Sequence, residues 1–170
     1  MTYSSLRFLI LIVLVASLQG CGIYSLSGVT IPSNVKTYQV DFFGNQAPLI
    51  EPGVERTFTL ELQEQILNQT SLDLVNKDGD YVYQGEITRF FIAPMTATAD
   101  NTASQNRLTI AVNVRFTDTK DEEQSFEKAF SFFFDYPASQ QLTRSSLDAA
   151  LEVIFDQIVQ DIINETLMRW

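Results

Sequence analysis

Two stretches of regular alternation constrain the fold of this chain more than any other feature. In residues 108–117, apolar side chains alternate with small or polar ones, placing Leu108, Ile110, Val112, Val114 and Phe116 on one face and Thr109, Ala111, Asn113, Arg115 and Thr117 on the other. Residues 126–136 repeat the pattern with Phe126, Phe130, Phe132, Phe134 and Tyr136. Such alternation is typical of antiparallel strands with one buried face. The acidic stretch 118–124 between them predicts a solvated hairpin loop.

Two amphipathic helices are predicted on either side of these strands. The first covers about residues 51–70, where apolar side chains recur at four-residue steps and Glu51-Pro52 suits a helix start. The second follows the hydroxyl side chains of residues 143–146 and runs to about Met168. Further strands are predicted at 35–43, 71–75 and 81–92, the last ending at Ala93-Pro94.

This order predicts an α+β fold of two layers. Residues 35–170 form a single α+β domain, in which an antiparallel or mixed β-sheet of about four strands carries both helices packed on one face, in the order β-α-β-β-β-α. The segment 76–80 favours a turn over a calcium loop, since the repeated aspartates and distal glutamate of such a loop are missing.

The first residues have the layout of a secretory signal peptide. Arg7 lies in a short positive start, an apolar run follows from Phe8 to Ala16, and small residues come next. The apolar run is shorter than the roughly 18 residues that nominate a membrane-spanning helix. The alternatives are a buried amino-terminal helix or a true anchor helix. We predict that residues 1–20 are a cleaved signal peptide of the lipoprotein type.

The segment Leu18-Gln19-Gly20-Cys21 resembles the lipobox of bacterial lipoproteins. The resemblance implies that Cys21 becomes the amino terminus and carries covalent diacylglyceryl and acyl chains, including palmitate. Several chains anchor a protein stably where one holds it only marginally. Residues 21–34, rich in Gly, Ser and Thr, are then a lipidated tether to the membrane.

Composition excludes several classes of function. The chain has no histidine and one cysteine, which removes Ser-His-Asp and Cys-His nucleophile systems and the common His- and Cys-based zinc sites. A net charge of −10 argues against a nucleic-acid partner. Carboxylate pairs such as Asp118 with Asp121 fall in predicted turns, and a glycosidase needs two carboxylates flanking one cleft. We therefore predict no enzyme, no metal site and no cofactor beyond the lipid on Cys21.

The mature chain resembles the LptE family of lipopolysaccharide-assembly lipoproteins. The resemblance is carried by the cysteine with Gly22-Ile23-Tyr24-Ser25-Leu26-Ser27-Gly28, by the element order and by the closing helix. Gly85-Glu-Ile-Thr, Pro94-Met95, Asn106-Arg107-Leu108-Thr-Ile and Val112-Asn113-Val114 look like the divergent branch found in Bacteroidetes.

This resemblance implies a partner and a location. The chain would be lipid-anchored in the cell outer membrane, facing the periplasm, and would plug and stabilise the lumen of an LptD-type β-barrel. It would thereby assist lipopolysaccharide transport and outer-membrane assembly, with lipopolysaccharide itself a second candidate ligand. The family's basic ligand-binding residues have no matching motif here. Arg89, Arg107 and Arg115 are read as surface charges facing acidic neighbours.

The sheet face opposite the helices is the predicted partner interface. It is expected to be mostly small and neutral, as suits a polar barrel lumen, although solvated antiparallel faces look similar. Phe133 lies between two inward phenylalanines, so alternation directs it outward, where it would contact the barrel wall unless a bulge shifts the phase. The candidate interface residues are Thr109, Asn113, Thr117, Ser131 and Phe133.

A second class of function shares these features. A lipid-anchored accessory or pilot protein for another envelope complex, such as a secretin or efflux machine, would have the same lipobox and the same small α+β domain. Fold alone does not separate the two. The identity of the partner does.

Overall fold

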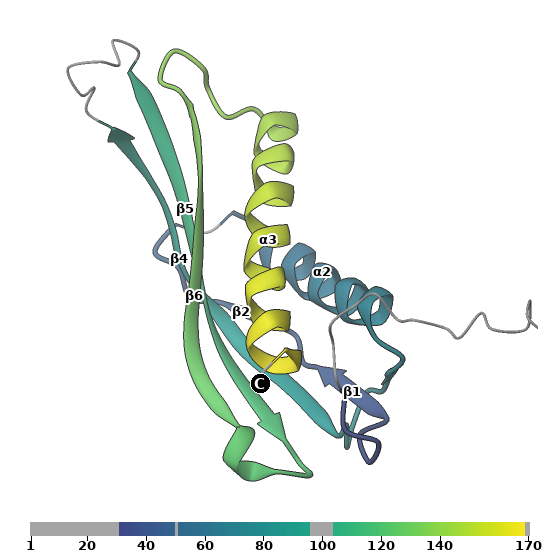
Figure 1. Cartoon of the computed structure of the whole chain (residues 1–170). Coiled ribbons are helices and arrows are strands. Elements are labelled where there is room, and N and C mark those ends of the chain that lie inside the picture. Colours follow the sequence, from purple (N-terminus) through teal and green to yellow (C-terminus); the bar gives the residue numbers. More distant parts are fainter. Residues whose placement is uncertain (1–30, 50, 96–103, 169–170) are drawn as a thin grey trace, which may run out of the picture.

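A computed structural model describes residues 31–49, 51–95 and 104–168 (Figure 1). The elements, in chain order, are β1 (Thr37–Val40), β2 (Gly44–Asn45), α2 (Val54–Gln69), β3 (Asp73–Leu74), β4 (Tyr81–Met95), β5 (Gln105–Asp118), the 3-10 turn η1 (Glu122–Gln124), β6 (Phe126–Pro137) and α3 (Arg144–Leu167). The predicted α+β class is confirmed. The signal peptide and Cys21 lie outside the described residues. Within those residues, no helix is long and apolar enough to cross a membrane.

The described strands form one mixed six-stranded sheet. Its order is β3-β1-β4-β5-β6, and β2 also pairs with β4. The three short strands pair in parallel, whereas β4, β5 and β6 form a long antiparallel meander. A bulge in β4 between Ile87 and Arg89 shifts the register against β5. Strands β1 and β2 therefore lie beside the lower half of the meander only, as Figure 1 shows.

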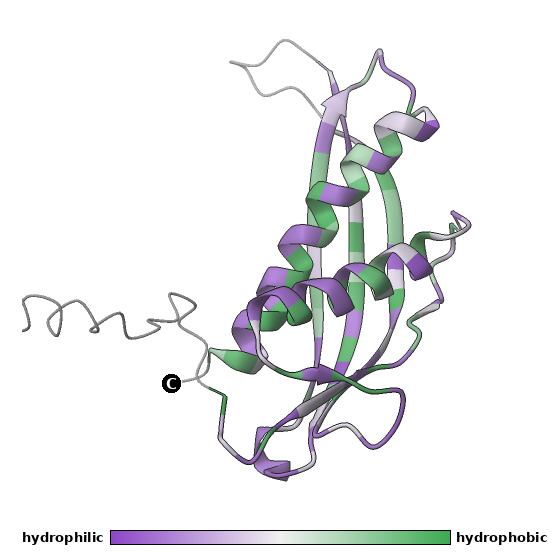
Figure 2. Cartoon of the chain, turned by 90° about the vertical axis from the view of Figure 1, so that its right-hand side faces the viewer, coloured by the Kyte–Doolittle hydropathy of each residue, from purple (hydrophilic) through white to green (hydrophobic). Residues whose placement is uncertain are grey.

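Both helices lie on the same side of the sheet, as predicted, and their apolar stripes face it (Figure 2). The core joins the two layers through three rings that meet edge to face. Phe58 of α2 lies 5.0 Å from Phe43 and 5.2 Å from Phe155 of α3, measured between ring centroids. All three side chains are essentially buried. Aromatic pairs in this geometry stabilise a core beyond the area they bury.

The alternation in residues 108–117 is realised in full. Every predicted inward side chain of β5 is buried, and its neighbours are half-buried or exposed. On β6, Phe130 and Tyr136 are buried, while the three other inward phenylalanines pack at the margin of the core. The prediction of one buried face is thus confirmed.

Three details differ from the prediction. The sheet has six strands rather than about four, because a second short strand, β2, follows the predicted strand 35–43 and pairs with β4. Strands β1 and β2 are separate because the Phe43 N–H donates to Thr59 Oγ1 of α2, 3.1 Å away, instead of to β4. Strand β4 passes through Pro94 to Met95, since an edge strand tolerates proline.

Helix α2 begins at Val54 rather than at Glu51-Pro52. Gly53 precedes it with φ of +92°, a left-handed conformation that glycine adopts without steric cost. The second helix begins one residue after Thr143, whose side chain accepts from the Ser146 N–H. This contact confirms that the hydroxyl cluster caps the helix.

Candidate interaction surface

The outward face of the β4–β5–β6 meander holds all five predicted interface residues. Thr109, Asn113 and Thr117 come from β5, and Ser131 and Phe133 come from β6. Thr117, Ser131 and Phe133 are exposed, while Thr109 and Asn113 are half-buried between neighbouring strands. The alternation thus predicts their orientation correctly. Their role as a partner interface stays a prediction.

An aromatic row crosses the upper half of this face. Thr109 pairs in register with Phe91 of β4 on one side and with Phe133 of β6 on the other. Both rings are exposed, Phe91 by 58% and Phe133 by 41%. Two outward phenylalanines flanking a threonine make an apolar strip on an otherwise polar face.

Arg107 and Asp135 form the next cross-strand row and fix one side of that strip. Two nitrogen atoms of the guanidinium, Nε and Nη2, donate to the carboxylate, at 2.7 Å each. The same guanidinium lies 3.6 Å above the ring centroid of Phe133, a cation–π contact. The hydrogen bonds from Arg107 hold the pKa of Asp135 below its usual range. Phe133 is therefore held in place by a charged pair.

The lower half of the face is a charged hydrogen-bond network. The Asn113 amide donates to Glu86 at 3.0 Å and to Glu127 at 2.6 Å. Arg115 lies 2.9 Å from Glu86 and 3.9 Å from Glu127. The Asn113 hydrogen bond, followed by that from Arg115, lowers the pKa of Glu86. All four side chains satisfy one another across three strands.

The expectation of a mostly small and neutral face is wrong in this respect. Besides Arg89, the face carries five charged residues: Glu86, Arg107, Arg115, Glu127 and Asp135. Their charges are paired, as predicted for Arg107 and Arg115. Sequence reasoning also missed Phe91. Its signal was the doublet Phe90-Phe91, because one member of an adjacent pair in a strand must point outward. The bulge after Ile87 obscured which one.

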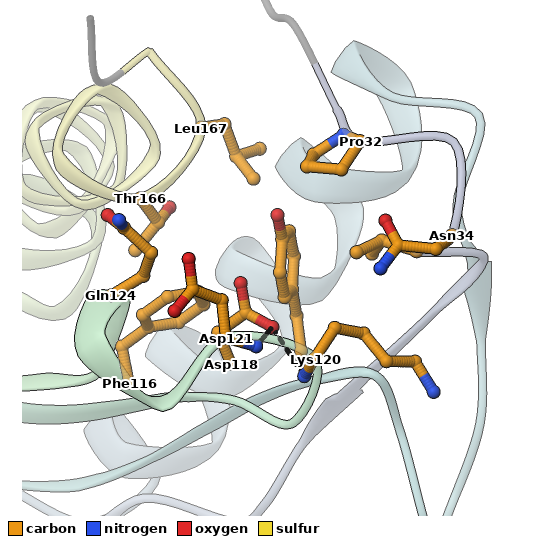
Figure 3. A pocket seen from close by; sticks show the side chains of 11 residues that line it. Pro32, Asn34, Phe116, Asp118, Lys120, Asp121, Gln124, Thr166 and Leu167 are labelled. Carbon is orange, nitrogen blue, oxygen red and sulfur yellow. Dashed lines mark hydrogen bonds between the residues drawn. The ribbon is translucent and has the colours of Figure 1, made fainter.

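A second feature is a cavity of about 500 Å³ at the lower end of the sheet, where Pro32, the β5–β6 hairpin and the last turn of α3 meet (Figure 3). Asp118 and Asp121 come from the same hairpin, and Asp118 accepts from the N–H groups of Lys120 and Asp121. Burial, and then the charge of Asp118, raises the pKa of Tyr81 to about 12.

Two charged residues that line this cavity, Asp118 and Lys120, both have polar partners. The Lys120 ammonium lies 2.7 Å from Asp80, which also accepts from two backbone N–H groups of the segment entering β1. These contacts, led by Lys120, lower the pKa of Asp80. Across the described residues, no three acidic, histidine or cysteine side chains gather to hold a metal ion. The cavity lies at one end of the domain, where Pro32, the β5–β6 hairpin and the last turn of α3 meet, and we assign its lining residues a structural role.

A comparison with known families decides the identity of the domain. A family model described as LptE, lipopolysaccharide-assembly, matches residues 35–166. The chain belongs to the LptE family. The family prediction is thereby confirmed, and membership places the chain in a non-catalytic lipoprotein family associated with lipopolysaccharide transport at the cell envelope. No curated protein sequence matches the chain.

Solved structures share the fold of this LptE-family chain at low identity. Protein XCC0632 from Xanthomonas campestris is 14% identical, with a TM-score of 0.53 over 81% of this chain and 86% of that one. Protein CT253 from Chlamydia trachomatis is 10% identical, with a TM-score of 0.51 over 79% and 99%. The PelC dodecamer from Paraburkholderia phytofirmans is 8% identical, with a TM-score of 0.50 over 82% and 94%. These similarities concern the fold alone.

Proposed function

We propose that this LptE-family protein is anchored to the outer membrane by lipid on Cys21, plugs the lumen of an LptD-type β-barrel and stabilises it for lipopolysaccharide transport. The observation that carries the proposal is the family match over residues 35–166, combined with a long outward sheet face that no described helix covers. The domain itself performs no chemistry. Its part is to fill the barrel and to hold it in its working form.

The outward sheet face suits a polar lumen because its charges are balanced. Strands β4, β5 and β6 carry three basic and three acidic residues on this face, and five of these six pair across strands. Barrel interiors are polar, so a plug needs hydrogen-bonding groups without a large unpaired charge. The aromatic row of Phe91 and Phe133 adds two apolar anchors on this surface, of the kind that dominate binding energy.

The helical layer is acidic, and its charge favours an orientation in which the helices face away from anionic lipid. Helix α2 has three acidic residues and one basic residue, and α3 has five acidic residues and one basic residue. A layer with a net charge of −6 repels phosphate groups. The sheet face is therefore the surface that meets the partner, and lipopolysaccharide is carried by the assembled complex.

A native pull-down tests the proposal directly. A carboxy-terminally tagged chain is purified from detergent-solubilised outer membranes, and the eluate is identified by mass spectrometry. A near-stoichiometric large β-barrel of the LptD type is the expected result. A secretin or an efflux component in its place would replace the barrel plug with an accessory or pilot role. Labelling with a palmitate analogue, lost in Cys21→Ser, tests the anchor separately.

A matched pair of variants tests the face. Phe133→Asp places a charge on the aromatic row and is expected to reduce recovery of the barrel. Leu60→Asp makes the same change at an exposed position of α2 in the helical layer, where Leu60 is 50% exposed, and is expected to leave recovery unchanged. Equal recovery with both variants would remove Phe133 from the interface.

A further inference from the structure

The upper half of β4 is a free sheet edge. Strands β1 and β2 pair with β4 only as far as Ile87, and the last bond on that side runs from the Gln46 N–H to the Ile87 carbonyl at 2.8 Å. Beyond that point, residues 88–95 pair with β5 alone among the described residues. Figure 1 shows this half of β4 with no ribbon on its outer side. An edge of this length is a template for another strand.

The backbone groups at this edge can be assigned from neighbouring hydrogen bonds. The Ala138 N–H donates to the Ser104 carbonyl, and the Thr119 N–H donates to the Asp80 carbonyl. Even-numbered residues of β5 therefore bond to β6, and odd-numbered ones bond to β4, because ladder bonds alternate. On β4, this leaves the main-chain groups of Phe90, Ile92 and Pro94 facing outward. Pro94 has no N–H to offer there, so the open donors and acceptors are those of Phe90 and Ile92.

The side chains along this edge are apolar. Leu49 is 51% exposed, and Phe91, Ile92 and Met95 are also exposed, so this short region holds four of the molecule's exposed large apolar side chains. A cavity of about 530 Å³ in the same region is lined by Pro48, Leu49 and the β4 segment 88–92. The free edge of β6 is different, because Glu127, Lys128 and Asp135 lie along it. Charged side chains protect an edge from pairing, and the β4 edge carries only one.

That one charge is Arg89. Its side chain is exposed and forms no ion pair within the described part of the chain, whereas Arg107 and Arg115 both pair with carboxylates. Arg89 lines the same cavity as Leu49 and Phe91. A ligand at this edge therefore meets open main-chain groups, an apolar cavity and a single cation.

We propose that the β4 edge between Thr88 and Ala93 accepts one extended segment of the β-barrel partner as an added strand. The segment would place an apolar side chain in the Leu49 cavity and a carboxylate beside Arg89. This inference rests on the proposed function, and it adds the mode of binding. Main-chain bonds give such a complex its affinity, and side-chain pockets give it specificity. Pro94 ends the added strand.

The charges favour a different protein over a second copy of this chain. Two copies of a chain with a net charge of −10 repel each other. The other free edge of the chain, on β6, carries Glu127, Lys128 and Asp135, and charged side chains protect an edge from pairing. Arg89 calls for a carboxylate on an apolar extended segment, and in a β-barrel protein such a segment lies in a loop or terminus, because the strands of a closed barrel wall have no free edge.

Proline substitution tests the strand addition. Ile92→Pro removes an open N–H at the β4 edge without removing a bond to β5, and Ala129→Pro does the same at the free edge of β6. The full-length variants are pulled down from outer membranes beside the wild type. We expect Ile92→Pro to lower barrel recovery by about tenfold, and Ala129→Pro to leave it within about twofold. Unchanged recovery with Ile92→Pro would overturn the proposal.

Arg89→Glu supplies a test that leaves the backbone intact. It is expected to lower recovery, and Arg89→Lys is expected to restore most of it. A photo-crosslinking residue in place of Leu49 should capture a peptide of the barrel protein, and one in place of Ala129 should not. Self-association of the purified chain that Ile92→Pro abolishes would assign the edge to a second copy and overturn the proposal. If the wild type recovers no barrel, the proposed function fails; if it does and these variants bind equally well, only strand addition fails.

Discussion

Gly85 is the position where a single methyl group should disturb this fold most. It lies in the lower half of β4, where Phe43 packs over it and Val114 of β5 lies opposite, next to Asn113. A Cβ added there would lie 2.5 Å from Phe43 Cε1 and closer still to the Asn113 carbonyl oxygen, whereas real Cβ contacts are essentially never below 3.0 Å. The oxygen belongs to the β4–β5 ladder and cannot move alone. Relief would have to displace Phe43 from Phe58.

We expect Gly85→Ala to lower the free energy of unfolding by about 1–2 kcal/mol. Overpacking costs about 1–3 kcal/mol or more, and the smaller entropy of the unfolded alanine chain offsets about 0.4–1 kcal/mol. Urea unfolding of a soluble chain beginning at Gly22, followed by circular dichroism, measures this difference.

The control is Gly44→Ala in the adjacent β2. A Cβ there has a single neighbour at 4.0 Å, and its backbone does not need the left-handed region. Its unfolding free energy should equal or slightly exceed that of the wild type. If Gly85→Ala also fell within about 0.5 kcal/mol of the wild type, the close packing of Phe43 on this glycine would be refuted.

Two further perturbations address the core and the outward face. Phe155→Ala should lower the free energy of unfolding by about 3–5 kcal/mol in the same urea assay, because it opens a cavity between α3 and Phe58; a loss below about 1 kcal/mol would contradict the ring cluster. Asp135→Asn tests the ion pair by pH. The pKa of Asp135 is lowered in the folded state, so its contribution is present above about pH 4 and is lost as pH falls. Between about pH 5 and pH 2 the variant should lose less stability than the wild type, and identical profiles would show that Arg107 gives Asp135 no net stabilisation.

Much of the fold was predictable because its elements follow simple periods. The alternation of β5 survives in the structure residue by residue, and the four-residue steps of α2 give its buried stripe. The separation of β1 from β2 was not predictable. It depends on a hydrogen bond from Phe43 to Thr59, 16 residues away, and no local pattern reports such a bond.

The candidate surface was predictable in orientation but not in extent. Alternation directs Phe133 outward without knowledge of any neighbour. The place of Phe91 in the row depends on the register of β4 against β5, and the bulge after Ile87 changes that register by one residue. A shift of one residue exchanges the two faces of a strand. The sequence therefore left open whether Phe90 or Phe91 joins the outward face.

The position of the exposed apolar cluster follows from the unequal lengths of the elements. Strands β4 and β5 extend about 46 Å, whereas α3 extends about 36 Å and α2 about 24 Å. Helix α2 covers the lower half of the sheet, where β1 and β2 also lie, so above Ile87 strand β4 loses its neighbouring strand and its helix together (Figure 1). The apolar side chains of Phe91, Ile92 and Met95 therefore contribute little to the core. Substitutions there should weaken binding with an unchanged free energy of unfolding, in contrast to Gly85→Ala and Phe155→Ala.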